Sequence, residues 1–135
     1  MRPLVTVFAA ATACLLGSVA ANAHHSFAAQ FDREQRVEFT GTVTKVEWTN
    51  PHSRFYVDAT DPEMDDDSPV SWNIEMVSAN VLMRQGWRHD TLQVGDVVTV
   101  SATRARKDPH VVNASTVDRD DGEALFRRTE EQVNQ

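Results

Sequence analysis

RVEFTGTVTKVEW, residues 36–48, is the stretch that decides the fold of this chain. Its apolar residues change parity part-way along: odd positions carry Val37, Phe39 and Val43, and even positions carry Val46 and Trp48. Because neighbouring side chains of a strand point to opposite faces, such a change predicts a β-bulge or bend near residues 44–45. A long first strand bent in this way can serve both sides of a small barrel.

The residues that follow predict four more strands and one helix. The strands are expected over residues 54–60, 70–76, 97–104 and 110–117, and the helix over 79–85. Ser78 is a good N-cap for that helix and Gly86 a good stop signal. Three strands, a short helix and two strands is the order of the five-stranded OB barrel. A split two-sheet sandwich or a small open barrel could give the same order, but the bent first strand favours the OB-like barrel.

The first 23 residues predict export. Arg2 precedes an apolar run over residues 4–16, and Ala21-Asn22-Ala23 matches a small-x-small cleavage signal. The apolar run is too short to span a bilayer, and no second run follows, so we expect a periplasmic protein without a membrane anchor. The expected segments are a signal peptide over 1–23, a lead-in over 24–35, a barrel domain over 36–118 and a charged tail over 119–135.

Composition limits what the mature chain can do. Cleavage after Ala23 removes Cys14, the only cysteine, so no disulfide is available. It also removes Arg2, and the charge falls from −7 to 12 basic minus 20 acidic residues, or −8. An acidic surface repels phosphate backbones, so nucleic acid is not an expected partner. No nucleophile–base pair, phosphate-binding loop or dinucleotide fingerprint is present, and we expect no enzymatic activity.

Histidines are the main candidates for chemistry. Imidazole is a common ligand of copper, zinc and nickel. Cleavage after Ala23 would make His24 the N-terminus, where its amine and ring could chelate one ion together with His25 or His52. Cleavage after Ala21 would instead give an Asn22-Ala23-His24 end, a different Cu(II) or Ni(II) chelate. The competing interpretation is that His24-His25 is a polar chain end that binds nothing.

Two loops add candidate ligand-binding residues. His52 follows Asn50-Pro51 between the first two strands, and His110 follows Asp108-Pro109 between the last two. These loops border the ligand-binding face of OB domains. Arg54 and Tyr56 share the outer face of the second strand, so the candidate ligand-binding set is Asn50, Arg54, Tyr56 and His110. If the lead-in is helical near Phe27 and Phe31, we expect His24 to fall short of His52, which is a conflict within the metal hypothesis.

Several motifs resemble one family. They are HHSF at 24–27, GTVTKVEWTNPH at 41–52, GW at 86–87, Leu92 and GDVVTV at 95–100. Together they resemble a family of small exported proteobacterial proteins of unknown function, with a looser similarity of strand order to periplasmic bacterial OB-fold proteins. The resemblance implies a periplasmic location, a small β-barrel and no established activity, and it carries over no catalytic residue. The Asp108-Pro109-His110 turn departs from the Gly-containing turn expected there.

The leading hypothesis is a non-enzymatic periplasmic binding module for a transition metal ion, most plausibly copper, held by His24, His25 and His52. A second hypothesis is an accessory domain that binds another exported protein. A third is an OB domain that binds a small molecule or glycan through Arg54, Tyr56 and the two rim loops.

Overall fold

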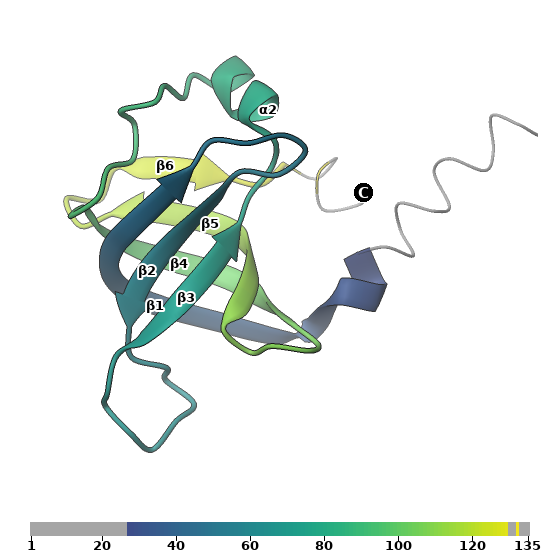
Figure 1. The fold of residues 1–135 in the computed structure, drawn as a ribbon, viewed down its shortest axis with the longest axis vertical. Coiled ribbons are helices and arrows are strands. Elements are labelled where there is room, and N and C mark those ends of the chain that lie inside the picture. Colours follow the sequence, from purple (N-terminus) through teal and green to yellow (C-terminus); the bar gives the residue numbers. More distant parts are fainter. Residues whose placement is uncertain (1–26, 130–131, 133–135) are drawn as a thin grey trace, which may run out of the picture.

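The computed structural model describes residues 27–129 and residue 132, and it is dominated by β-structure (Figure 1). After one helical turn at 27–30 the elements are β1 (Phe31–Glu47), β2 (Arg54–Ala59), β3 (Val70–Glu75), α2 (Ala79–Arg84), β4 (Val97–Ala105), β5 (Val111–Arg119) and β6 (Ala124–Arg127). Three strands, a short helix and two strands thus follow each other as expected, and β6 is an addition. In Figure 1, α2 and the long β2–β3 loop lie at opposite ends of the sheet.

The strand pairings close a barrel. β1 pairs antiparallel with both β2 and β4, β2 pairs with β3, and β4 pairs with β5. A parallel pairing of β3 with β5, from Asn73↔Val111 to Glu75↔Asn113, joins the two halves. This is the connectivity of an OB-like barrel, with its helix between the third and fourth strands, and it confirms the expected fold class.

β1 can pair on both sides because it bends. Its register against β2 shifts between Val43 and Lys45, which confirms the bulge expected at residues 44–45. Just before the bulge, Gly41 lies very close to β2: a Cβ atom on Gly41 would be 2.3 Å from the Asp58 carbonyl oxygen and 2.6 Å from the Ala59 Cβ. Glycine is therefore required where the bent strand meets its neighbour.

The core fills the barrel with alternate residues of each strand. Phe39 and Trp72 stack at its centre, with ring centroids 4.0 Å apart and planes inclined by 16°. Trp72 is fully buried, and its indole N–H donates to the Ala59 carbonyl over 3.2 Å. From α2, the side chains of Ala79 and Leu82 are buried, and the Ser78 hydroxyl accepts from the Val81 N–H as the expected N-cap. In β3, the alternate residues Trp72 and Ile74 are both fully buried.

The folded domain extends beyond residues 36–118 at both ends. β1 begins at Phe31, inside the expected lead-in, because Phe31 is 1% exposed and pairs with Ala105 of β4. β6 lies inside the expected tail, where Phe126 is 2% exposed and the Trp87 indole N–H donates to the Leu125 carbonyl over 2.8 Å. Leu125 and Phe126 therefore belong to a sixth strand and not to a charged tail. The expected signal peptide lies outside the described residues. In the part of the chain that is described, no helix is both long and apolar enough to cross a membrane.

Candidate functional site

A pocket of about 370 Å³ opens beside the end of β3, between the β1–β2 loop and the residues that follow β6. We call it the His52 pocket. Its polar wall is formed by His52, Glu75, Asn113, Arg128 and Gln132, and its apolar wall includes Phe27, Phe31 and Val81. The volume lies within the range of small-ligand sites.

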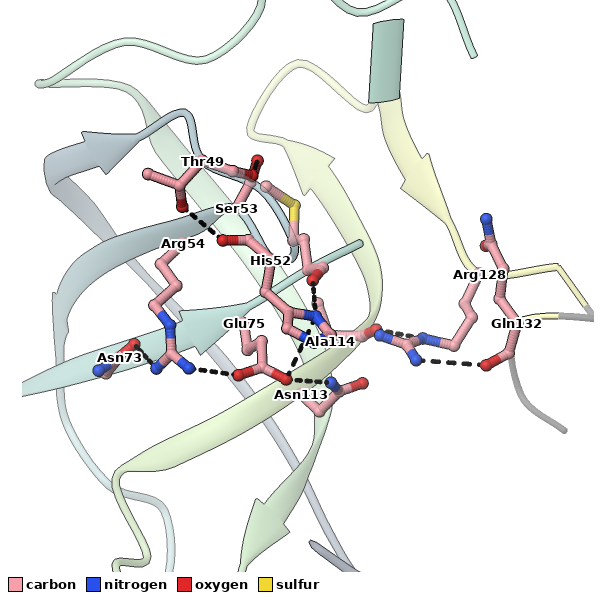
Figure 2. Close-up of polar contacts among 11 residues, drawn as sticks. Thr49, His52, Ser53, Arg54, Asn73, Glu75, Asn113, Ala114, Arg128 and Gln132 are labelled. Atoms are coloured by element: carbon pink, nitrogen blue, oxygen red, sulfur yellow. Dashed lines mark hydrogen bonds and ion pairs between the residues drawn. The ribbon is translucent and has the colours of Figure 1, made fainter. Parts of the chain in front are cut away.

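Glu75 is the centre of the polar wall, and strand pairing puts it there. It is the last residue of β3, opposite Arg54 of β2 and Asn113 of β5. Its side chain is 5% exposed, and its two oxygens accept hydrogen bonds from the Arg54 guanidinium and, over 3.3 Å, from the Asn113 amide. Figure 2 shows the carboxylate between these two side chains. A buried carboxylate needs such partners, because an unpaired buried charge is costly.

His52 lies over the same carboxylate. Its Nδ1 is 3.3 Å from the Met76 carbonyl oxygen and 3.7 Å from Glu75 Oε1 (Figure 2). Because a carbonyl oxygen can only accept, Nδ1 carries the proton. No hydrogen bond to Nε2 occurs among the described residues, and the side chain is 52% exposed. The ring is therefore held from one nitrogen and keeps the other as a free electron-pair donor.

The loop that carries His52 is fixed by hydrogen bonds within the loop and to a residue that follows β3. The Thr49 hydroxyl donates to the His52 carbonyl over 2.5 Å, and the Ser53 N–H donates to the Val77 carbonyl over 3.0 Å. The Asn50–Pro51 peptide is cis. These contacts hold the loop against the end of β3.

Arg128 enters the pocket wall just after β6. Its Nε donates to the Ala114 carbonyl over 2.9 Å, and its Nη1 makes a 3.5 Å contact with the Gln132 carbonyl. Its Nη2 is buried and has no hydrogen-bond partner within the described ranges. Burial lowers the pKa of this guanidinium, while the nearby charge of Glu75 raises it. Within the described part of the chain, the Arg128 side chain is therefore bonded only to backbone oxygens.

Phe27 and Phe31 form the apolar wall. Their ring centroids are 5.1 Å apart, as expected for residues one helical turn apart. Phe27 thus lines the same pocket as His52, although 25 positions separate them in the sequence. His24 and His25, expected as metal ligands, lie outside the described residues.

Comparison with known proteins identifies the family but not an activity. The model of a family of unknown function, DUF6152, matches residues 12–113. The chain belongs to this family. No curated protein matches this chain of the DUF6152 family.

Solved structures give a distant likeness only. Two crystal structures of Rim1, a mitochondrial single-stranded DNA-binding protein from S. cerevisiae, are similar to the chain with TM-scores of 0.45 and 0.43 and sequence identities of 11% and 12%. Each likeness covers 66% of this chain and 93% of the other.

The structure separates the two proline-linked histidines of the DUF6152 chain. His52 lies over Glu75, whereas the His110 Nε2 donates to the Asp61 carboxylate over 3.1 Å. His110 also packs edge-on against Trp72, with ring centroids 5.0 Å apart. His110 is therefore part of a different polar cluster and does not line the His52 pocket.

The other candidate ligand-binding residues have structural partners. Asn50 accepts from the Asn80 N–H of α2 over 3.3 Å, and the Tyr56 hydroxyl donates to Glu47 over 3.3 Å. Arg54 is engaged with Glu75 and Asn73. Of the four candidate ligand-binding residues, Arg54 alone is bonded to a residue of the polar wall, Glu75.

Sequence reasoning missed Glu75, Asn113 and Arg128. Each is an ordinary polar residue on a strand or at a strand end, and only the pairing of β3 with β5 brings the first two together. Asp61 is a further buried acid, at 5% exposure, that the sequence did not single out. It lies two residues after β2, ahead of the more exposed acids of the loop.

Proposed function

We propose that this chain is an exported, non-enzymatic binding module that takes a transition metal ion, with copper preferred, at the mouth of the His52 pocket. His52 would bind the ion through Nε2, and His24 and His25 would supply further ligands. The observation that carries the proposal is the orientation of His52, whose Nδ1 donates to the Met76 carbonyl and leaves Nε2 without a partner in the described structure. Metal-binding histidines characteristically donate their other ring N–H to a carbonyl or carboxylate, which fixes the tautomer.

The position of Phe27 supports a contribution from the N-terminal histidines. Phe27 lines the pocket, and His24 and His25 precede it by only three and two residues. Three residues of chain span at most about 11 Å. A helical lead-in was expected to leave His24 short of His52. The helical turn at 27–30 instead leaves Phe27 in the same pocket as His52, which supports a site shared with the N-terminal histidines.

The metal-ligating side chains of the described residues also favour a site in which His52 is joined by ligands from the N-terminus. No group of three or more His, Cys, Asp or Glu side chains suited to a metal ion occurs among residues 27–129 and 132. His52 and Glu75 are neighbours, but Glu75 is already engaged by Arg54 and Asn113. A complete site therefore needs donors from outside the described residues, and His24, with a free amine after cleavage, and His25 are the ones we propose. Nitrogen-rich sites of this kind suit Cu(II).

Copper titration of the mature protein tests the proposal. The protein should begin at His24, without a tag, because a tag would block the amine. We expect one Cu(II) ion per chain, a nitrogen-rich EPR spectrum, and at least tenfold weaker binding in His52→Ala, on the order of the losses seen when metal sites are perturbed. His89→Ala is the matched control: His89 packs against Trp48 outside the pocket, at a centroid distance of 5.1 Å, and its loss should leave copper affinity unchanged.

Two results would contradict the proposal. One is copper binding to His52→Ala as tightly as to the parent protein. The other is equal binding to a His24→Ala, His25→Ala double variant. The mass of the protein recovered from the periplasm tests export and shows whether cleavage follows Ala23 or Ala21.

A further inference from the structure

Among the described residues, the Arg128 guanidinium in the wall of the His52 pocket has no acidic hydrogen-bond partner. Arg128 donates only to the carbonyls of Ala114 and Gln132, and none of its hydrogen bonds in the described structure goes to a carboxylate. Its Nη2 is shielded from water without a partner. A charged donor left without an acceptor in a buried position is costly, because it has given up water and gained nothing in return.

Among the described residues, Glu75 is the one acid that lines the pocket with Arg128, and Arg54 pairs with it directly. Taken together, the described side chains of Glu75, Arg54 and Arg128 carry two positive charges and one negative charge, a net charge of +1. That local sign is opposite to the chain's overall charge of −7. An anion bound here would be attracted by local contacts, not by the field of the whole protein.

The remaining wall of the pocket suits hydrocarbon. Phe27, Phe31 and Val81 line it, and the pocket volume is about 370 Å³. A cavity with apolar walls and a few fixed polar groups is typical of sites for small organic molecules. The polar groups orient such a ligand and the apolar walls supply most of its binding energy.

We infer that the His52 pocket binds a small organic carboxylate, with its carboxylate on Arg128 and its hydrocarbon part against Phe27, Phe31 and Val81. Arginine is suited to this role because its planar fork can donate two parallel hydrogen bonds to a carboxylate. For a carboxylate to bind both Nη1 and Nη2 of Arg128, the Gln132 carbonyl must move away from Nη1. Its contact with Nη1 is 3.5 Å long, at the limit for a hydrogen bond. This site does not depend on a bound metal ion, so it stands separately from the proposed copper site.

The experiment compares matched ligands on the metal-free mature protein, dialysed against EDTA. Hexanoate and 3-phenylpropanoate are the probes, and hexanamide and 3-phenylpropanamide are their uncharged controls. We expect each carboxylate to bind by calorimetry and each amide to bind at least about tenfold more weakly, because the charge-assisted hydrogen bonds are lost. His89 lies outside the pocket, so His89→Ala should keep carboxylate binding, and binding by the metal-free protein distinguishes this site from the copper site.

Arg128→Gln tests the residue, and Arg127→Gln is its control. Arg127 is the preceding residue, is half-exposed, and pairs with Asp118 outside the pocket. Carboxylate affinity should fall at least about tenfold in Arg128→Gln and stay unchanged in Arg127→Gln. If Arg128→Gln does not fold, the Nε–H NMR signal of Arg128 in the parent protein replaces it, and it should shift with hexanoate but not with hexanamide.

Three outcomes would overturn the inference. They are failure of the parent protein to bind either carboxylate more tightly than its amide, unchanged binding in Arg128→Gln, and an Arg128 signal that does not respond to hexanoate.

Discussion

Arg104 holds Asp61 by two hydrogen bonds in the interior of the domain. Nη2 lies 2.7 Å from Asp61 Oδ1 and Nη1 lies 3.0 Å from Oδ2, and both side chains are at most 5% exposed. The same guanidinium donates to the Pro109 carbonyl and lies over the Trp72 ring, 5.1 Å from its centroid. This ion pair therefore ties β4 and the β4–β5 turn to the start of the loop that follows β2.

Removing the charge of Asp61 should destabilise the fold. In Asp61→Asn the Arg104 guanidinium loses its buried counter-charge and keeps only the exposed Glu63 carboxylate, 3.3 Å from Nη2. Breaking a buried pair in this way costs about 3–5 kcal/mol. Urea unfolding at pH 7 measures the change. Asp66→Asn, in the exposed part of the same loop, is the control and should change the free energy of unfolding by less than about 0.5 kcal/mol. Equal effects of the two substitutions would show that the ion pair contributes nothing.

The same pair predicts a dependence of stability on pH. The hydrogen-bonded Arg104 guanidinium lowers the pKa of Asp61 from 3.8 to about 2, against the effect of burial, which raises it. Because the folded-state pKa is the lower one, the stabilisation is complete above pH 3.8 and is lost as the pH falls through 2. A shift of this size corresponds to about 2 kcal/mol. Urea unfolding between pH 5 and pH 2 should therefore show the parent protein losing its advantage over Asp61→Asn within this window. A constant difference across that range would contradict the assignment.

Gly41 should not tolerate a side chain. Alanine there would place its Cβ 2.3 Å from the backbone oxygen of Asp58, so the β1–β2 pairing would have to open. We expect Gly41→Ala to cost at least about 3 kcal/mol, at the upper end for overpacking. Gly122→Ala is the control, because Gly122 has φ +89° but nothing within 4 Å of an added Cβ. Its cost should be only the backbone strain of about 1–2 kcal/mol. Chemical denaturation of the two variants provides the comparison, and the reverse order of stability would disprove the close approach.

Phe126 should make β6 an essential part of the domain. Its side chain is 2% exposed within the main core. Phe126→Ala should therefore lower the free energy of unfolding by about 3–5 kcal/mol. Leu125→Ala, a truncation at the adjacent half-buried position, should cost clearly less. A chain ending at Asp118 should be less stable still. Full stability of that shortened chain would mean that the barrel domain ends where the sequence suggested.

The barrel was predictable because its signals are local. Side chains on a strand alternate with a period of two, so the parity change between Val43 and Val46 revealed the bulge directly. Ser78 and Gly86 marked the ends of the helical segment for similarly local reasons. The ends of the domain were less predictable, because Phe31 and Phe126 lie in charged stretches where nothing local reveals that they are buried.

The candidate site was only partly predictable. His52 stood out by its place in a loop after Asn50-Pro51, and it does line a pocket. His110, which follows a proline in the same way, lies elsewhere, because the two histidines contact different buried acids. Glu75 and Arg128 carried no signal, since isolated charged residues on strands are usually exposed.

The sequence by itself determined the element order, the bend of the first strand and most of the core, because these follow from short-range periodicity and local turn chemistry. Only the tertiary structure decided which charges meet. Glu75 reaches Asn113, 38 positions away, through the parallel β3–β5 register, and Asp61 reaches Arg104, 43 positions away, through closure of the barrel. Electrostatic pairing depends on distance in space and on burial, and neither is set until the strands have paired.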